Sequence, residues 1–254
     1  MTVRIKYIIP FPFGPEGVAM RAAGIPRGAL DSDTIVDCVA VRNSFDTSSP
    51  DAGANVYDAM LLEMYVVEAG LAAEDEGYDA VVIDTMSDSG LDVLRSRLTI
   101  PVLGQGTAAV STAISIGRRL AFLVYVPENA FIVEKVIAYH GIGARCTVHA
   151  LDLVPDFERL LDDDFETQLG RFEEVGRAAI AEARADTIVL GSGTMYQAAA
   201  PLQARLGVPV IDPASVTLRL AESLVRLGLS HSKVSYPSPP VIQDHKFRSL
   251  EGAS

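Results

Sequence analysis

Cysteine is scarce in this chain of 254 residues, which contains Cys38, Cys146 and no other. The two residues lie far apart in unrelated sequence contexts, and this argues against a disulfide framework or a metal-binding knuckle. No spacing of histidine, cysteine and carboxylate residues suits a metal site either. We therefore expect a protein that works without a metal or a cofactor.

Positive charge and long apolar runs are also in short supply. The chain has 21 Lys and Arg against 33 Asp and Glu, and the basic residues are scattered, so nucleic acid and anionic membrane are poor partners. No apolar run reaches the roughly 18 residues of a membrane span, and the N-terminus lacks a secretory pattern. We expect a cytoplasmic protein whose partner is a small-molecule substrate.

What the chain does contain is one segment written twice. The first copy reads DAVVIDTMSDSGL from Asp79 and closes with RLTIPV from Arg97, and the second reads DTIVLGSGTM from Asp186 and closes with RLGVPV from Arg205. Each copy has a short β-branched run, a polar turn, a stretch of helix length and the start of another strand. The repeat therefore predicts a βαβ unit that occurs in both halves of the chain.

The two copies place Thr85 opposite Ser192, each just past the carboxyl end of a predicted strand. In open α/β sheets this edge is where ligands bind. Either hydroxyl could bind a carbonyl group or relay a proton, and Ser192 could act as a nucleophile if a base lay nearby. Alternatively, each residue only caps the helix that follows it.

The rest of the chain follows the same plan and predicts two lobes, one of residues 1–103 with 214–254 and one of residues 104–213. A polar loop is expected over 42–55, and the acidic cluster Asp162, Asp163 and Asp164 reads as a solvated helix N-terminus. Strands are expected over 3–9, 34–41, 119–127 and 146–153, and helices over 16–30 (weakly), 56–76, 108–116, 165–183 and 214–227.

Several stretches together resemble the aspartate/glutamate/hydantoin racemase superfamily, and most closely its hydantoin and allantoin racemase branch. The likeness runs almost from end to end. The stretches that carry it are RIKYIIP from Arg4, GYDAVVI from Gly77, SDSGL from Ser87, GRR from Gly117, IVLG from Ile188, LGVPVIDP from Leu206 and GLSHSK from Gly228.

This resemblance implies an α/β fold of two similar lobes with mainly parallel sheets, related by a pseudo-two-fold axis, with the active site in the cleft between them. In such racemases one cysteine from each lobe flanks the substrate. One thiolate removes the proton α to a carbonyl, and the other thiol returns a proton on the opposite face. A thiol suits this role because its ordinary pKa of about 8.5 lies near the working pH. We also expect a homo-oligomer.

The chain departs from the family at the residues that do the chemistry. Thr85 and Ser192 stand where the family has its two cysteines, so the two-thiol mechanism does not carry over. The usual Asn-Pro-Asn entry reads Ile9-Pro10-Phe11, which suggests a less polar or larger substrate. Asp84 replaces the small residue that normally precedes the first cysteine, and it could serve as a single base.

The predicted site therefore combines hydroxyl and carboxylate groups with glycine-rich turns. Alternatives remain open: Asp88 could shape a turn, Glu128 could be an exposed loop acid, and the glycines before the helix at 108–116 could form a tight turn. His140 is expected at the far end of its helix, pointing away. The predicted catalytic residues are Thr85, Ser192 and Asp84, and the predicted substrate-binding residues are Phe11, Asp88, Gly106, Thr107, Glu128, Gly193, Thr194 and Tyr196.

Three functions fit these residues. The first is a cofactor-independent isomerase that acts at the carbon α to the carbonyl of a small carboxylate or cyclic amide. The second is a lyase, decarboxylase or hydrolase that uses Ser192, Thr85 and a carboxylate on the same scaffold. The third is a binding protein without turnover. Isomerase is the default that the resemblance implies.

Overall fold

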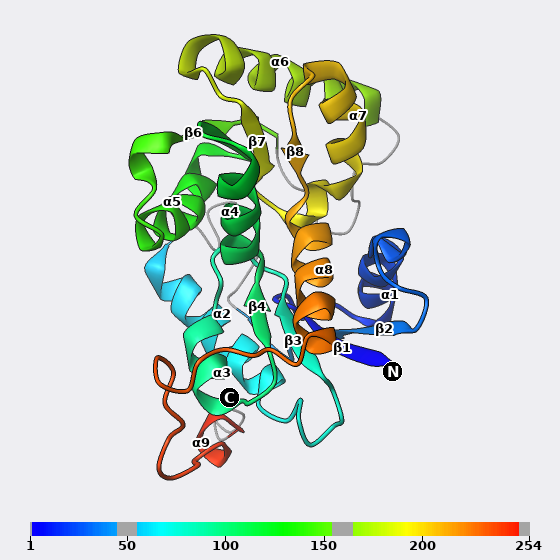
Figure 1. The fold of residues 1–254 in the computed structure, drawn as a ribbon, viewed down its shortest axis with the longest axis vertical. Helices are drawn as coiled ribbons and strands as arrows, with labels where there is room; N and C mark the ends of the chain where they lie inside the picture. Colours follow the sequence, from blue (N-terminus) through cyan, green and yellow to red (C-terminus); the bar gives the residue numbers. More distant parts are fainter. Residues whose placement is uncertain (1, 45–54, 154–164, 249–254) are drawn as a thin grey trace. The chain divides into compact units, whose positions relative to one another are not determined.

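A computed structural model describes residues 2–44, 55–153 and 165–248. The predicted acidic cluster at 162–164 and most of the predicted loop at 42–55 lie outside these ranges. The chain divides into two compact units, which are described separately (Figure 1). Unit 1 comprises Met1–Gly104 and Leu218–Ser254, and unit 2 comprises Gln105–Thr217.

Unit 1 contains a parallel sheet of four strands in the order β2-β1-β3-β4. Its strands are rich in Val and Ile, whose branched side chains suit a pleated surface with both faces covered. The register places Tyr7 beside Cys38 on one side and beside Val82 on the other. The strands are β1 (Val3–Ile9), β2 (Thr34–Ala40), β3 (Ala80–Ile83) and β4 (Val102–Gly104).

Alternate side chains of this sheet enter two separate cores. Ile8 and Ile83 belong to a core that α2 (Val56–Gly70) and α3 (Leu91–Arg97) complete, and Phe247 from α9 (His245–Arg248) packs against it. Tyr7 and Val82 face the other core, which includes side chains from α1 (Pro15–Ala23) and α8 (Pro213–Arg226). Both faces of the sheet are therefore covered by helices.

Unit 2 has the same strand order in its own parallel sheet, β6-β5-β7-β8. Side chains of α6 (Phe165–Ala183) and α7 (Tyr196–Leu206) build one core with the sheet. Helix α4 (Gln105–Ile116) contacts β7 and β8, and α5 (Ala130–Tyr139) contacts β6. The strands are β5 (Leu120–Val124), β6 (Cys146–Ala150), β7 (Thr187–Leu190) and β8 (Val210–Ile211).

The aspartate that begins each copy of the repeat makes equivalent hydrogen bonds in the two units. Asp79 accepts a hydrogen bond from Arg4 N at 2.8 Å, and its own N donates to Arg4 O at 2.8 Å. Asp186 accepts from Arg118 N and Arg119 N at 2.9 to 3.1 Å, and its own N donates to Arg119 O at 2.9 Å. Each carboxylate thus ties the start of one central strand to the start of the next.

These observations confirm the predicted α/β class with parallel sheets. The helix predicted over 56–76 ends at Gly70, but Leu71 and Ala73 stay buried in the core, so the apolar period continues after the helix has stopped. The helix predicted over 108–116 begins at Gln105, because β4 passes into α4 without a connecting residue. Within the described ranges, no helix is long and apolar enough to cross a membrane.

Candidate functional site

Thr85 and Ser192 occupy equivalent places at the carboxyl edges of the two sheets. Thr85 is the second residue after β3, which ends at Ile83, and Ser192 is the second residue after β7, which ends at Leu190. In a parallel sheet the peptide groups beyond this edge are released from strand pairing and can hold a ligand. The internal repeat therefore delivers a hydroxyl group to the same position in each unit.

Thr85 in unit 1 is 9% exposed, and its Oγ1 accepts a hydrogen bond from Ser89 N at 3.2 Å. This bond shapes the turn before α3, but Gly90 is the N-cap of α3 and no side chain caps that helix, so Thr85 does not fill the capping role. Asp88 adopts the left-handed region with φ of 53°, and its side chain lies so close to Gly104 that any larger residue at 104 would clash with it. Asp88 thus has the turn-shaping role that the sequence left open, while its predicted contact with substrate remains a prediction.

Asp84 sits in a buried cluster of charged and polar groups. Both of its oxygens accept hydrogen bonds from Arg21 at 2.7 Å, and Oδ1 also accepts from the Tyr7 hydroxyl at 2.7 Å. The Asp84 and Arg21 side chains are 6% and 3% exposed. Such charge-assisted bonds hold the Asp84 carboxylate firmly in place. Its assignment as a base remains a prediction.

Cys38 lies beside this cluster, on β2 opposite Tyr7. Burial, reinforced by the negative charge of Asp84, raises the pKa of the Cys38 thiol to about 11. Since the thiolate is the reactive form of cysteine, this thiol is a poor base or nucleophile near neutral pH. Burial also raises the pKa of Cys146.

Ser192 in unit 2 immediately precedes the short 3-10 helix Gly193–Met195 and is its N-cap. Its Oγ accepts from Thr194 N at 3.2 Å and lies 2.8 Å from Thr194 Oγ1. Gly191 fixes the approach to this turn, because a Cβ at 191 would lie 2.5 Å from Leu123 O on β5. Ser192 is therefore held by the close packing of two neighbouring strands.

The Ser192 turn is linked to the end of β5 by a further hydroxyl contact. Tyr125 follows β5, and its hydroxyl lies 2.8 Å from Thr194 Oγ1. The Tyr125 ring is 8% exposed and belongs to the core under α6 and α7. Three hydroxyl groups therefore form one connected chain at the carboxyl edge of the unit 2 sheet.

The first turn of α4 carries two more of the predicted residues, Gly106 and Thr107. Thr107 Oγ1 lies 3.2 Å from Nε2 of His140, the residue that ends α5. The expectation that His140 points away from the predicted site residues is therefore wrong. The packing of α5 against α4, which no local sequence pattern encodes, brings His140 to Thr107.

The other predicted binding residues are placed as follows. Phe11 stacks on Phe13, with ring centroids 5.9 Å apart, and packs against the core under α2 and α3. Glu128 is exposed in the turn after β5, as the loop-acid alternative requires. Tyr196 begins α7, and its hydroxyl accepts from Gln197 Nε2 at 3.0 Å. Their contacts with substrate remain predictions.

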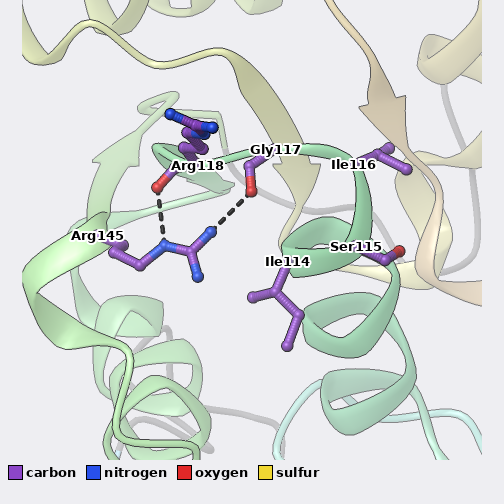
Figure 2. Close-up of a pocket in the computed structure, with 6 residues that line it drawn as sticks. All are labelled: Ile114, Ser115, Ile116, Gly117, Arg118 and Arg145. Atoms are coloured by element: carbon purple, nitrogen blue, oxygen red, sulfur yellow. Dashed lines mark hydrogen bonds between the residues drawn. The ribbon is translucent and has the colours of Figure 1, made fainter.

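A hollow of about 550 Å³ lies at the opposite, amino edge of the unit 2 sheet, lined by Ile114, Ser115, Ile116, Gly117, Arg118 and Arg145 (Figure 2). The Arg145 guanidinium donates to Gly117 O at 2.7 Å and to Arg118 O at 2.8 Å (Figure 2). These bonds satisfy carbonyl groups at the end of α4. We therefore interpret the hollow as the C-terminal end of α4, capped by Arg145. It lies away from the hydroxyl groups at the carboxyl edge of the sheet.

The described residues contain no group of three or more His, Cys, Asp or Glu side chains placed to hold a metal ion. His231 and Lys233, in the tail, bind the end of α3 instead. Lys233 Nζ donates to Leu98 O at 2.6 Å, and His231 Nε2 lies 2.8 Å from the same oxygen. Both residues therefore act as helix caps in unit 1.

Sequence reasoning missed Arg21 and the role of Tyr7. Arg21 lies in a stretch that read as a weak helix, and Tyr7 lies inside an apolar strand, so neither carried a pattern that joined it to Asp84. Tyr125 lies near the end of the strand predicted over 119–127. Its partner Thr194 became recognisable only when β5 and β7 were seen as neighbours.

The chain was also compared with known proteins. The Asp/Glu/hydantoin racemase family model matches residues 27–221. A hydantoin racemase from Rhizobium meliloti is 33% identical over 237 residues, which cover 91% of this chain and 96% of the relative.

Comparison with solved structures supports the same family assignment. An allantoin racemase from Klebsiella pneumoniae has a TM-score of 0.82 at 29% identity, with 95% of each chain covered. Arylmalonate decarboxylase has a TM-score of 0.60 at 20% identity, with 87% of this chain and 92% of that chain covered, which shows a shared fold. The chain therefore belongs to the Asp/Glu/hydantoin racemase family and is an enzyme of the isomerase class.

Proposed function

We propose that this enzyme is a cofactor-independent racemase that acts at the carbon α to the carbonyl of a small cyclic amide or carboxylate, with hydantoins as the first substrate class to test. Likeness to a hydantoin racemase over nearly the whole chain supports the substrate class. The observation that carries the chemistry is the pair of hydroxyl residues, Thr85 and Ser192, two residues beyond β3 and β7.

The chemistry then follows from ordinary acid-base requirements. Racemisation needs a group that removes the α-proton and a group that returns one to the other face of the planar carbanion. An aliphatic hydroxyl is a weak acid and a weak base, so Thr85 and Ser192 act with help from neighbouring groups. Hydrogen bonds to the carbonyl oxygen would stabilise the negative charge that develops there.

The proposal is tested by following the α-hydrogen of the substrate. Enantiopure 5-substituted hydantoins and amino acids, and prochiral arylmalonates, are incubated with the protein in D₂O. Deuterium incorporation is read by NMR and inversion by chiral chromatography. We expect deuterium at the α-carbon together with formation of the other enantiomer from at least one hydantoin.

The other outcomes contradict the racemase proposal in distinct ways. Release of CO₂ from a malonate identifies a decarboxylase, and a ring-opened N-carbamoyl acid identifies a hydrolase. Binding of a compound without any change to it identifies a binding protein. Ser192→Ala and Thr85→Ala serve as matched variants, and both are expected to lose turnover while they retain the fold.

A further inference from the structure

Three hydroxyl groups of unit 2 form a continuous chain of short contacts. The Tyr125 hydroxyl lies 2.8 Å from Thr194 Oγ1, and Thr194 Oγ1 lies 2.8 Å from Ser192 Oγ. They come from the ends of β5 and β7, which pair directly in the sheet. The chain therefore depends on the packing of two strands that lie some 65 residues apart in sequence (Leu123 pairs with Leu190).

The number of hydrogen bonds that each group can make allows a direction that runs from Tyr125 through Thr194 to Ser192. A hydroxyl has one hydrogen to donate and two lone pairs to accept with. Thr194 N donates to Ser192 Oγ at 3.2 Å. If Thr194 Oγ1 donates to Ser192 as well, both lone pairs of Ser192 are used and its own hydrogen turns away from Thr194. Thr194 Oγ1 then accepts from Tyr125.

The two ends of the chain differ greatly in acidity. A phenol has an ordinary pKa of about 10, whereas water, the simplest relative of an aliphatic hydroxyl, has a pKa of about 15.7. The phenol is thus the stronger acid by more than five orders of magnitude. It is also held firmly, because the Tyr125 ring is buried in the core under α6 and α7.

We propose that Tyr125 is the proton reservoir for Ser192, and that it acts through the Thr194 hydroxyl. This inference rests on the proposed racemase function. It explains how a serine can occupy the position where the family resemblance implies a thiol. The acid is the Tyr125 phenol, which is separated from the substrate by the hydroxyl groups of Thr194 and Ser192. Ser192 is the group that touches the substrate, and Tyr125 and Thr194 are the residues that supply and position its proton.

The step balances as a single proton transfer. The electron pair of the substrate carbanion forms a new C–H bond with the Ser192 hydroxyl proton. Ser192 Oγ takes the proton of Thr194 Oγ1, which takes the proton of the Tyr125 hydroxyl. Tyr125 is left as a phenolate, and water reprotonates it after the product leaves. The reverse sequence removes a proton from the opposite enantiomer.

The kinetic test compares Tyr125→Phe and Thr194→Val with Thr194→Ser, which keeps the relay hydroxyl, and with Tyr57→Phe, an exposed tyrosine of α2. We expect kcat for racemisation to fall about 100-fold or more in the first two variants, with KM changed less than about threefold. Thr194→Ser should recover part of the activity that Thr194→Val loses, whereas Tyr57→Phe, which lies outside the relay, should retain full activity. For the enantiomer whose racemisation uses Ser192 to return the proton, the alkaline decline of kcat, where the phenol ionises, should disappear in Tyr125→Phe. Unchanged kcat and pH profile in both relay variants would overturn the inference.

A second measurement does not depend on turnover. In Ser192→Cys, the pKa of the introduced thiol is titrated by thiolate absorbance, alone and combined with Tyr125→Phe or Thr194→Val. Donors from the relay favour the thiolate, so the thiol pKa should rise by about half a unit or more in both combinations. An unchanged pKa overturns the relay. If the wild-type protein turns over no substrate, the proposed function fails, and this titration still decides whether the relay exists.

Discussion

Cys38 and Cys146 show how the surroundings of a residue decide its chemistry. A thiol is the group that the family resemblance implies for the chemistry, yet burial next to Asp84 raises the pKa of Cys38 to about 11. At pH 8 only about one molecule in a thousand would then carry the thiolate at this position. In the proposed function, reactivity lies instead with the hydroxyl residues at the carboxyl edges of the sheets.

We therefore predict that iodoacetamide at pH 8 leaves the turnover of the wild-type protein unchanged, because the proposed function uses neither thiol and Cys38 is almost wholly protonated. Ser192→Cys should become sensitive, since Thr194 N would donate to the new sulfur and favour its thiolate. Activity is followed against the extent of alkylation measured by mass spectrometry. Inactivation of the wild-type protein in step with Cys38 labelling would contradict this prediction.

Glu222 on α8 is a buried acid that joins α8 to the loop before β2. Its side chain is 1% exposed, and it accepts from Asp31 N at 3.0 Å as well as from Thr34, Arg219 and Arg226. Burial alone would raise the pKa of Glu222, but the hydrogen bonds from these groups together outweigh burial and hold the pKa below its ordinary value.

We predict that Glu222→Gln lowers the free energy of unfolding by about 2 kcal/mol at pH 7. A folded-state pKa below the unfolded value of about 4.3 means that this stability is present above pH 4.3. It is lost as the pH falls through the folded-state pKa, so the difference between wild type and variant should shrink in acid. Urea unfolding at several pH values measures it.

Glu166→Gln is the matched control, because Glu166 forms an ion pair with Arg205 while 77% exposed. An exposed pair of this kind contributes less than about 1 kcal/mol. If the two variants lost equal stability at pH 7, the buried network around Glu222 would have no special role.

At the scale of single elements, the repeat predicted much of what the structure shows. The strand at Val3–Ile9 and the helix at Phe165–Ala183 have the predicted limits. Where the limits differ, the cause is tertiary. The helix that begins at Val56 ends earlier than predicted. Leu71 and Ala73 are buried in the core beyond its end, so the apolar pattern of the sequence runs further than the helix. Helix α9 went unnoticed because its four residues are too few to show a period.

The approach of β7 to β5 gives a test at this scale. A side chain at Gly191 would meet Leu123 O at 2.5 Å and Val124 Cγ1 at 2.9 Å. We predict that Gly191→Ala destabilises the protein by about 1 to 3 kcal/mol and lowers turnover, because the backbone must shift and Ser192 moves with it. Unfolding in urea and racemisation rates measure the two effects.

Gly170→Ala provides the control, since a Cβ at this position in α6 meets nothing within 4 Å. Alanine is preferred over glycine inside a helix, so this variant should gain about 0.5 to 1 kcal/mol. Equal stability of the two variants would show that the close contact at Gly191 carries no cost.

At the scale of the whole molecule, unit 1 is completed by the end of the chain. Leu218 and Ala221 of α8 pack in the core on one face of its sheet, and Phe247 packs on the other face. The tail also caps α3 through Lys233 and pairs Asp244 with Arg97 at 2.8 Å. Unit 1 is therefore discontinuous in sequence, with 113 residues of unit 2 (Gln105–Thr217) inserted in it.

We predict that a chain ending at Thr217 leaves unit 1 without cooperative unfolding, because part of its core is missing. A chain ending at Leu227 keeps α8 and should fold, with its Tm lowered by roughly 5 to 10 °C through the loss of the tail contacts. Thermal unfolding followed by circular dichroism distinguishes them. A chain ending at Thr217 that melts as cooperatively as the full chain would contradict the discontinuous unit.

The sequence by itself determined the repeat, the α/β class, the family resemblance and the positions of Thr85 and Ser192, because these follow from local periodicity and from residues close together in the chain. Only the tertiary structure decided the partners: Arg21 and Tyr7 for Asp84, Thr194 and Tyr125 for Ser192, and His140 for Thr107. The physical reason is that a polar side chain gains its chemical character from neighbours on other elements. The register of strands and the crossing of helices, which no local pattern encodes, place those neighbours beside it.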